Sequence, residues 1–247
     1  HSDILGNDRT VWIYTPPGYT SDGAPCGLLL LFDGWAHTHI APMPTILDNL
    51  LAEGLLPPLV AVMPGNAEGG RTRELSCYPP FIDFLTQELP PWARQSYHLT
   101  TDPARTVVAG ASLGGLAAAL AALRHPEVFG NVLSQSGSFY WGPETGPFYW
   151  GPNDGVEFEW LTRQFVTSPR LPLRFYLEVG LLERDPRGVN GPSMVLANRH
   201  FRDVLQAKGY AVHYAEFNGG HECLCWQGTL DDGLLFLMGN GVEARHR

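Results

Sequence analysis

The chain has 247 residues with 25 acidic and 16 basic side chains, and its formal net charge of −9 argues against a nucleic-acid or anionic-membrane partner, since both demand a basic face. Hydrophobic residues make up 44% and charged residues 17%, which is typical of a globule that needs neither disulfides nor a metal for stability. No apolar run approaches the roughly 18 residues of a membrane span, and no signal peptide follows His1, so we expect a cytoplasmic protein.

Short apolar or β-branched runs alternate with helical patterns along the chain. This alternation predicts an α/β fold, in which helices cover both faces of a mostly parallel central sheet. Because no stretch resembles a linker, we expect a single domain over residues 1–247. Strands are expected over 10–15, 27–32, 59–63, 107–109, 131–135, 173–179 and 212–217. Helices are expected over 44–53, 81–94 with a kink at Pro90-Pro91, 116–123, 156–165, 193–208 and 226–238.

The most informative stretch is the G-x-S-x-G motif at 110–114, preceded by a β-branched run and followed by an Ala/Leu-rich one. It therefore lies between an expected strand and an expected helix, the context that a nucleophile elbow requires. In such an elbow a sharp turn projects the serine hydroxyl clear of the sheet, and Gly110 and Gly114 suit the crowding there. The alternative is a Gly/Ser turn with no chemistry. We interpret Ser112 as the nucleophile of an α/β-hydrolase fold.

An oxyanion hole is expected where the strand over 27–32 ends, at Asp33-Gly34-Trp35. On this fold the loop after that strand supplies one backbone N–H, and the residue after the nucleophile supplies the other. The donors would be Gly34 or Trp35 together with Leu113. An ordinary Asp-Gly turn is the alternative.

The acid and the base of a triad follow the serine in the chain order that this fold uses. Glu183 and Asp185 come just after the expected strand over 173–179, and both qualify by position. His221 ends the Gly-rich turn after the last strand, from which an imidazole can reach the elbow serine and act as general base.

Two features suggest where a substrate would bind. Arg71 and Arg73 form a close arginine pair, which is either a solvated surface or a rim that holds an anionic or catecholate oxygen. Phe139, Tyr140 and Trp141 begin an aromatic segment, Phe-Tyr-Trp-Gly-Pro at 139–143, which recurs at 148–152. These rings either form a wall on which a flat aromatic group stacks or pack their own loop down.

Neither a metal nor an organic cofactor is expected. His37 and His39 lack a third ligand of obvious spacing and are interpreted as loop histidines. No C-x-x-C pair suggests zinc, and free thiols are expected at Cys26, Cys77, Cys223 and Cys225, with a Cys77 bridge to either of the last two as the alternative.

Several motifs together resemble the ferric enterobactin esterase (enterochelin esterase) family, in the esterase-D-like branch of the α/β-hydrolases. They lie at 71–75, 109–116, 125–130, 132–138 and 219–221, with Cys225-Trp226 after the last, and the likeness runs from about Arg9 to Leu237. The resemblance implies Ser112 as nucleophile and His221 as base, favours Glu183 over Asp185 as the acid, and adds Trp226 to the substrate-binding candidates. Family members of the enterobactin type carry an additional N-terminal domain, which this chain does not contain before His1. The aromatic segment at 139–152 is longer than the usual loop.

We therefore expect a serine esterase that forms an acyl-enzyme on small catecholate or aromatic esters such as siderophore trilactones. One alternative is a general carboxylesterase or a feruloyl or acetyl-type esterase. Another is a non-catalytic module that binds aromatic or siderophore ligands on a hydrolase fold. No oligomeric state is predicted.

Overall fold

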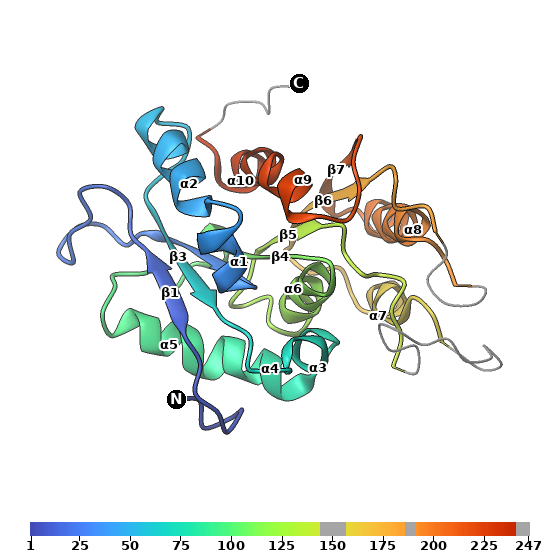
Figure 1. The fold of residues 1–247 in the computed structure, drawn as a ribbon, viewed down its shortest axis with the longest axis horizontal. Helices are drawn as coiled ribbons and strands as arrows, with labels where there is room; N and C mark the ends of the chain where they lie inside the picture. Colours follow the sequence, from blue (N-terminus) through green and yellow to red (C-terminus); the bar gives the residue numbers. More distant parts are fainter. Residues whose placement is uncertain (144–156, 186–190, 241–247) are drawn as a thin grey trace.

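The computed structural model describes residues 1–143, 157–185 and 191–240 (Figure 1). Within these ranges, seven strands form one sheet in the order β1-β3-β2-β4-β5-β6-β7. They are β1 (Val11–Tyr14), β2 (Gly27–Leu31), β3 (Leu59–Pro64), β4 (Thr106–Ala111), β5 (Asn131–Gln135), β6 (Arg174–Gly180) and β7 (Ala211–Phe217). Strand β1 pairs antiparallel with β3, and the other neighbours are parallel. The mostly parallel sheet is confirmed.

Helices cover both faces of this sheet (Figure 1). They are α1 (Gly34–His39), α2 (Met43–Ala52), α3 (Arg71–Leu75), α4 (Pro79–Asp83), α5 (Leu89–Arg94), α6 (Leu113–Arg124), α7 (Trp160–Thr167), α8 (Met194–Ala207), α9 (Cys223–Gln227) and α10 (Leu230–Met238). The continuous apolar runs have a physical reason: Leu28 and Leu30 pack under α3 to α8, whereas Leu29 and Leu31 pack under α2 and α10. Both faces are therefore core.

Two expected helices are divided. The helix expected over 81–94 consists of α4, a π-helical segment (Phe84–Glu88) and α5. Pro90 has no N–H, and the Leu89 N–H donates to the carbonyl of Phe84, five residues back. The helix expected over 226–238 consists of α9 and α10, which turn at Gly228 and Thr229.

Smaller differences concern helix ends and loops. Helix α7 begins at Trp160, later than expected. The arginine pair lies on the short helix α3, for which no helix was expected. His37 and His39 likewise lie on α1 rather than in a loop. A short apolar pattern of about one turn is too weak to predict such helices.

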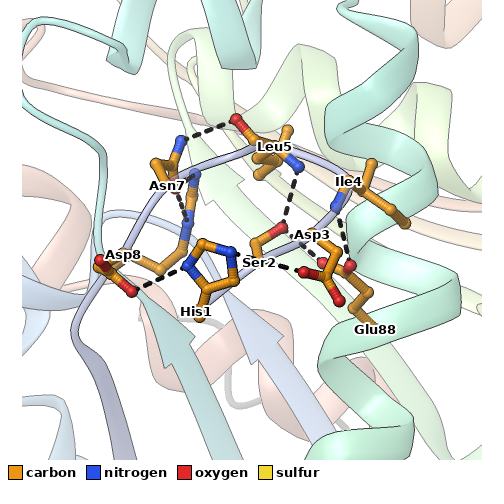
Figure 2. A network of polar contacts seen from close by, with 9 residues as sticks. His1, Ser2, Asp3, Ile4, Leu5, Asn7, Asp8 and Glu88 are labelled. Atoms are coloured by element: carbon orange, nitrogen blue, oxygen red, sulfur yellow. Dashed lines mark hydrogen bonds and ion pairs between the residues drawn. The ribbon is translucent and has the colours of Figure 1, made fainter.

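The N-terminal segment is tied to the π-helical segment through Glu88 (Figure 2). The Glu88 carboxylate accepts hydrogen bonds from the Ser2 hydroxyl and from the backbone N–H of Ile4, at 2.5 and 2.9 Å. A little further on, Arg9 makes a fully buried ion pair with Glu74 of α3, with 2.9 Å between Nη2 and Oε1. The segment thus anchors the helix that carries Arg71.

No helix in the described ranges is both long enough and apolar enough to cross a membrane.

Candidate active site

Ser112 lies at the turn from β4 into α6, with φ 60° and ψ −122°. A non-glycine residue rarely adopts this conformation, which costs on the order of 1–3 kcal/mol and is retained only where the surroundings impose it. The turn is crowded: a Cβ on Gly110 would lie 2.7 Å from the carbonyl carbon of Gly114, and one on Gly115 would lie 2.2 Å from Ser134 Oγ. Gly114 itself has ordinary room for a Cβ, so Gly110 and Gly115 are the glycines that the turn requires.

His221 and Glu183 reach this serine from the ends of β7 and β6. The imidazole Nε2 of His221 lies 2.9 Å from Ser112 Oγ, and its Nδ1 lies 2.5 Å from Glu183 Oε2. This is the hydrogen-bonded order of a nucleophile, a base and an orienting acid.

The two carboxylates that the sequence offered behave differently. Glu183 is buried, whereas Asp185 is exposed. Burial alone would raise the pKa of Glu183, but hydrogen bonds from His221 and Ser136, together with the charge of His221, hold it below its usual range. The Glu183 carboxylate is therefore ionised where it meets the imidazole.

The candidate oxyanion donors lie at one edge of the sheet. Strands β2 and β4 are parallel neighbours, and α1 and α6 begin directly after them. The first N–H groups of a helix have no partner within it, and Gly34, Trp35 and Leu113 occupy those first positions in α1 and α6. Asp33 turns the chain with φ 58°, and a Cβ on Gly34 would lie 2.4 Å from the carbonyl oxygen of Met63.

A cavity of about 340 Å³ reaches the elbow at Ala111, the residue before Ser112. It is lined by residues from both sides of the elbow: Asp33, Trp35, Ala36, His37, Ala41, Asn66, Arg71, Ala111, Cys223 and Trp226. Trp226 packs edge-on against His221, with 4.9 Å between ring centres. Trp35 stacks on His39 and is 55% exposed, so an aromatic surface borders the cavity.

Arg71 brings a fixed positive charge to this cavity. Its Nε and Nη2 donate to the two oxygens of Asp33, both at 2.7 Å, and Asn66 donates to the same carboxylate at 2.6 Å. Burial would lower the pKa of Arg71, but Asp33 outweighs this and raises it. Burial also lowers the pKa of nearby His37 to about 4, leaving that imidazole neutral at pH 7.

Other substrate-binding candidates lie elsewhere. Arg73 is exposed and rests over the ring of Tyr78, and it does not line the cavity. Phe139, Tyr140 and Trp141 are buried at 0%, 7% and 7% exposure. Of the two alternatives left open for these three rings, the structure agrees with packing rather than a substrate wall, because they lie in the core beneath α7 and α8. The second copy, at 148–152, lies outside the described residues.

A model of one protein family, described as putative esterase, matches residues 2–237 of the chain. The chain belongs to this esterase family.

Among its relatives, the iron(III) enterobactin esterase of Dickeya dadantii is 34% identical over the whole chain and 55% of its own length. That of Escherichia coli K12 is 35% identical over 96% of the chain and 55% of its own length. The enterobactin esterase of Shigella flexneri, solved in the presence of enterobactin, superposes with a TM-score of 0.81 at 32% identity. It covers 96% of this chain and 56% of that one. The chain therefore has the α/β-hydrolase fold, and it spans about half the length of these relatives.

Sequence reasoning missed the residues that hold this esterase-family site together. Ser136 donates to Glu183, and Asp33 and Asn66 fix Arg71. The chain itself gave a weak signal for two of them, since Ser136 and Asp33 each directly follow the end of an expected strand.

No cluster of three or more His, Cys, Asp or Glu side chains able to hold a metal occurs within the described ranges. The four cysteines are free in this structure. The chemistry available is that of Ser112, His221 and Glu183, beside a cavity lined by the Arg71–Asp33 ion pair and by aromatic rings.

Proposed function

We propose that this chain is a serine carboxylesterase of the enterochelin-esterase type. The observation that carries the proposal is the unbroken hydrogen-bonded series from Ser112 Oγ through His221 to Glu183, at 2.9 and 2.5 Å. Side chains from three separate strand ends meet in the order that nucleophilic catalysis needs.

In the proposed reaction, Ser112 Oγ attacks the ester carbonyl while its proton passes to His221 Nε2. Glu183 stabilises the imidazolium that forms, and the N–H groups of Leu113 and of Gly34 or Trp35 bind the oxyanion. The imidazolium then returns the proton to the leaving alcohol, which leaves an acyl-enzyme. Water attacks this ester with His221 again as base, releasing the acid and restoring Ser112.

The proposed substrates are small catecholate or aromatic esters, including siderophore trilactones. Arg71 is held by Asp33 through Nε and Nη2, and among the described residues its Nη1 has no hydrogen-bond partner, so we assign Nη1 to a phenolate or catecholate oxygen. The rings of Trp35 and Trp226 offer surfaces for stacking. The names of the relatives above support the trilactone in particular.

A second candidate is a general carboxylesterase, or one acting on feruloyl or other single-ring esters. The size of the cavity favours it, because about 340 Å³ is near the lower limit of ligand pockets and suits one ring with its acyl carbon.

The decisive variant is Ser112→Ala. Turnover should fall by at least about 10⁴-fold with unchanged circular dichroism, because the nucleophile is removed while the fold remains. Appreciable residual hydrolysis would overturn the assignment. A fluorophosphonate probe should label the wild-type serine and leave the variant unlabelled, whereas a binding module without chemistry labels neither.

Initial rates on three substrate classes then separate the two candidates: short p-nitrophenyl esters, methyl ferulate, and enterobactin with and without iron. A trilactone rate higher by orders of magnitude supports the siderophore ester. A higher rate on methyl ferulate or on the simple esters supports the second candidate.

A further inference from the structure

Ser136 is a buried polar residue that the mechanism above does not use. It follows β5 directly, is fully buried, and has φ 48°, in the left-handed region that a serine seldom adopts. Its own N–H donates to the carbonyl of Glu178 on β6, at 2.7 Å. The backbone thus holds the Ser136 side chain in one direction.

The hydroxyl of Ser136 makes two hydrogen bonds whose polarity is fixed. It lies 3.0 Å from Trp226 Nε1 and 2.5 Å from Glu183 Oε1. An indole N–H only donates and an ionised carboxylate only accepts, so the hydroxyl must accept from Trp226 and donate to Glu183. Trp226 therefore determines which way the Ser136 proton points.

Because Ser136 binds one oxygen of Glu183, the two carboxylate oxygens have different partners. Oε1 accepts from Ser136 and from the N–H of Gly180 at 3.0 Å, whereas Oε2 accepts from His221 Nδ1. With Oε1 held twice, the carboxylate is kept from rotating and Oε2 stays directed at the imidazole. In the described ranges, His221 is the titratable side chain that interacts with this carboxylate.

We propose that Ser136, oriented by the indole N–H of Trp226, is a positioning residue that holds Glu183 against His221. The inference rests on the proposed esterase function and assigns to it two residues outside the triad. Neither residue needs to touch the reacting atoms for this role.

The neighbouring residue supports the same unit. Gln135 donates from Nε2 to the carbonyl of Trp226 at 2.7 Å, which fixes α9 where its indole meets Ser136. The carbonyl of Gln135 accepts the N–H of Ser112 at 2.9 Å. The end of β5 therefore holds the nucleophile, the acid and the tryptophan at fixed relative positions.

The first test is Ser136→Ala, measured as kcat and KM across pH. A hydrogen bond to a charged group is lost, so kcat should fall roughly 10- to 100-fold with little change in KM. Without this donor the carboxylate loses its fixed direction toward His221, so the imidazolium is stabilised less. The acid limb of kcat/KM should therefore move to lower pH. An unmoved limb, or a loss confined to KM, contradicts the proposal.

Trp226→Phe keeps a ring beside His221 and removes the N–H. The fall in kcat should be smaller than in Ser136→Ala. The acid limb of the kcat/KM profile should move in the same direction as in that variant. If the indole acts through Ser136, the double variant should equal Ser136→Ala alone, because the hydroxyl that it orients is gone. Fully additive losses contradict a shared role. If Ser136→Ala does not fold, the acid limb of kcat/KM in Trp226→Phe is the test. An acid limb at the wild-type pH then contradicts the proposal.

Ser134→Ala is the matched control. Ser134 is an equally buried serine on β5, and within the described residues its hydroxyl has no hydrogen-bond partner. Its removal should leave the acid limb in place, and a limb that moves as far as in Ser136→Ala contradicts a specific role for Ser136. The outcomes also separate the two proposals. If Ser112→Ala is inactive and the acid limb of Ser136→Ala stays at the wild-type pH, only the positioning role is overturned. If Ser112→Ala is active, the esterase assignment itself is overturned.

Discussion

Two glutamates at the end of β6, Glu178 and Glu183, are both buried, yet their titrations are shifted in opposite directions. Glu178 accepts hydrogen bonds from Gln135, Thr229 and Tyr176, at 2.8, 2.5 and 3.1 Å. Glu183 accepts a similar number. Hydrogen bonds therefore do not distinguish the two carboxylates.

The difference lies in the depth of burial, since Glu178 is fully buried and Glu183 is 5% exposed, and in the charge of the neighbours. Burial raises the pKa of Glu178 to about 7, neutral donors offset this only in part, and the nearby charge of Asp232 adds to it. Burial acts in the same direction on Glu183, but His221 can become a cation and its contacts reverse the shift. The carboxylate with the lower pKa is thus the one whose partner can carry a positive charge.

Opposite shifts imply opposite effects of pH on stability. The folded-state pKa of Glu178 is raised, so its contribution is complete below the ordinary value of 4.5 and is lost as the pH rises through about 7. The folded-state pKa of Glu183 is lowered, so its contribution is present above its ordinary value and is lost in acid.

The largest expected effect is on catalysis, in Glu183→Gln. An amide of the same shape cannot stabilise an imidazolium and favours the wrong tautomer of His221. We expect kcat to fall about 10³- to 10⁴-fold. Steady-state kinetics with a p-nitrophenyl ester measure this. A loss below tenfold would remove Glu183 from the triad.

The next effect is on stability, in Glu178→Gln, which replaces the carboxyl by a permanently neutral group. As the pH rises from 4.5 to 7, the free energy of unfolding of the variant should increase by about 3 kcal/mol relative to that of wild type, because the variant does not have to ionise a buried acid. Urea unfolding of both proteins at pH 5 and pH 8 measures the gain. If the free energies of unfolding of variant and wild type differ by the same amount at both pH values, Glu178 does not titrate in this range.

A smaller effect is expected for Thr229→Val, which removes one donor from Glu178. Stability should fall by about 1 kcal/mol at pH 5, where the carboxyl is neutral, and by about 2 kcal/mol at pH 8, where it is charged. The same unfolding experiment applies. A loss independent of pH would assign Thr229 a packing role alone.

The smallest effect is expected for Asp185→Asn, the matched control for Glu183→Gln. Asp185 is exposed and only two positions further along the chain, so kcat should stay within about twofold of wild type. A loss comparable to that of Glu183→Gln would mean that the loop after β6 rearranges when substrate binds.

The sequence by itself determined the alternation of strands and helices, because buried parallel strands require continuous apolar runs. The local pattern of apolar runs and glycines also located Ser112 on a strand-to-helix turn and His221 on the turn after the last strand. These features depend on neighbours in the chain, and the residues that encode them are adjacent.

Only the tertiary structure decided which side chains meet. Ser112 and His221 are 109 positions apart, and their contact depends on how β4 and β7 end along one sheet edge. Glu183 and Asp185 are indistinguishable by spacing, but one side chain points inward and the other into solvent. The burial of Phe139 and the partners of Ser136 likewise depend on helices from distant parts of the chain. Packing, rather than local pattern, sets these contacts because each is made between segments whose relative position no short stretch of sequence encodes.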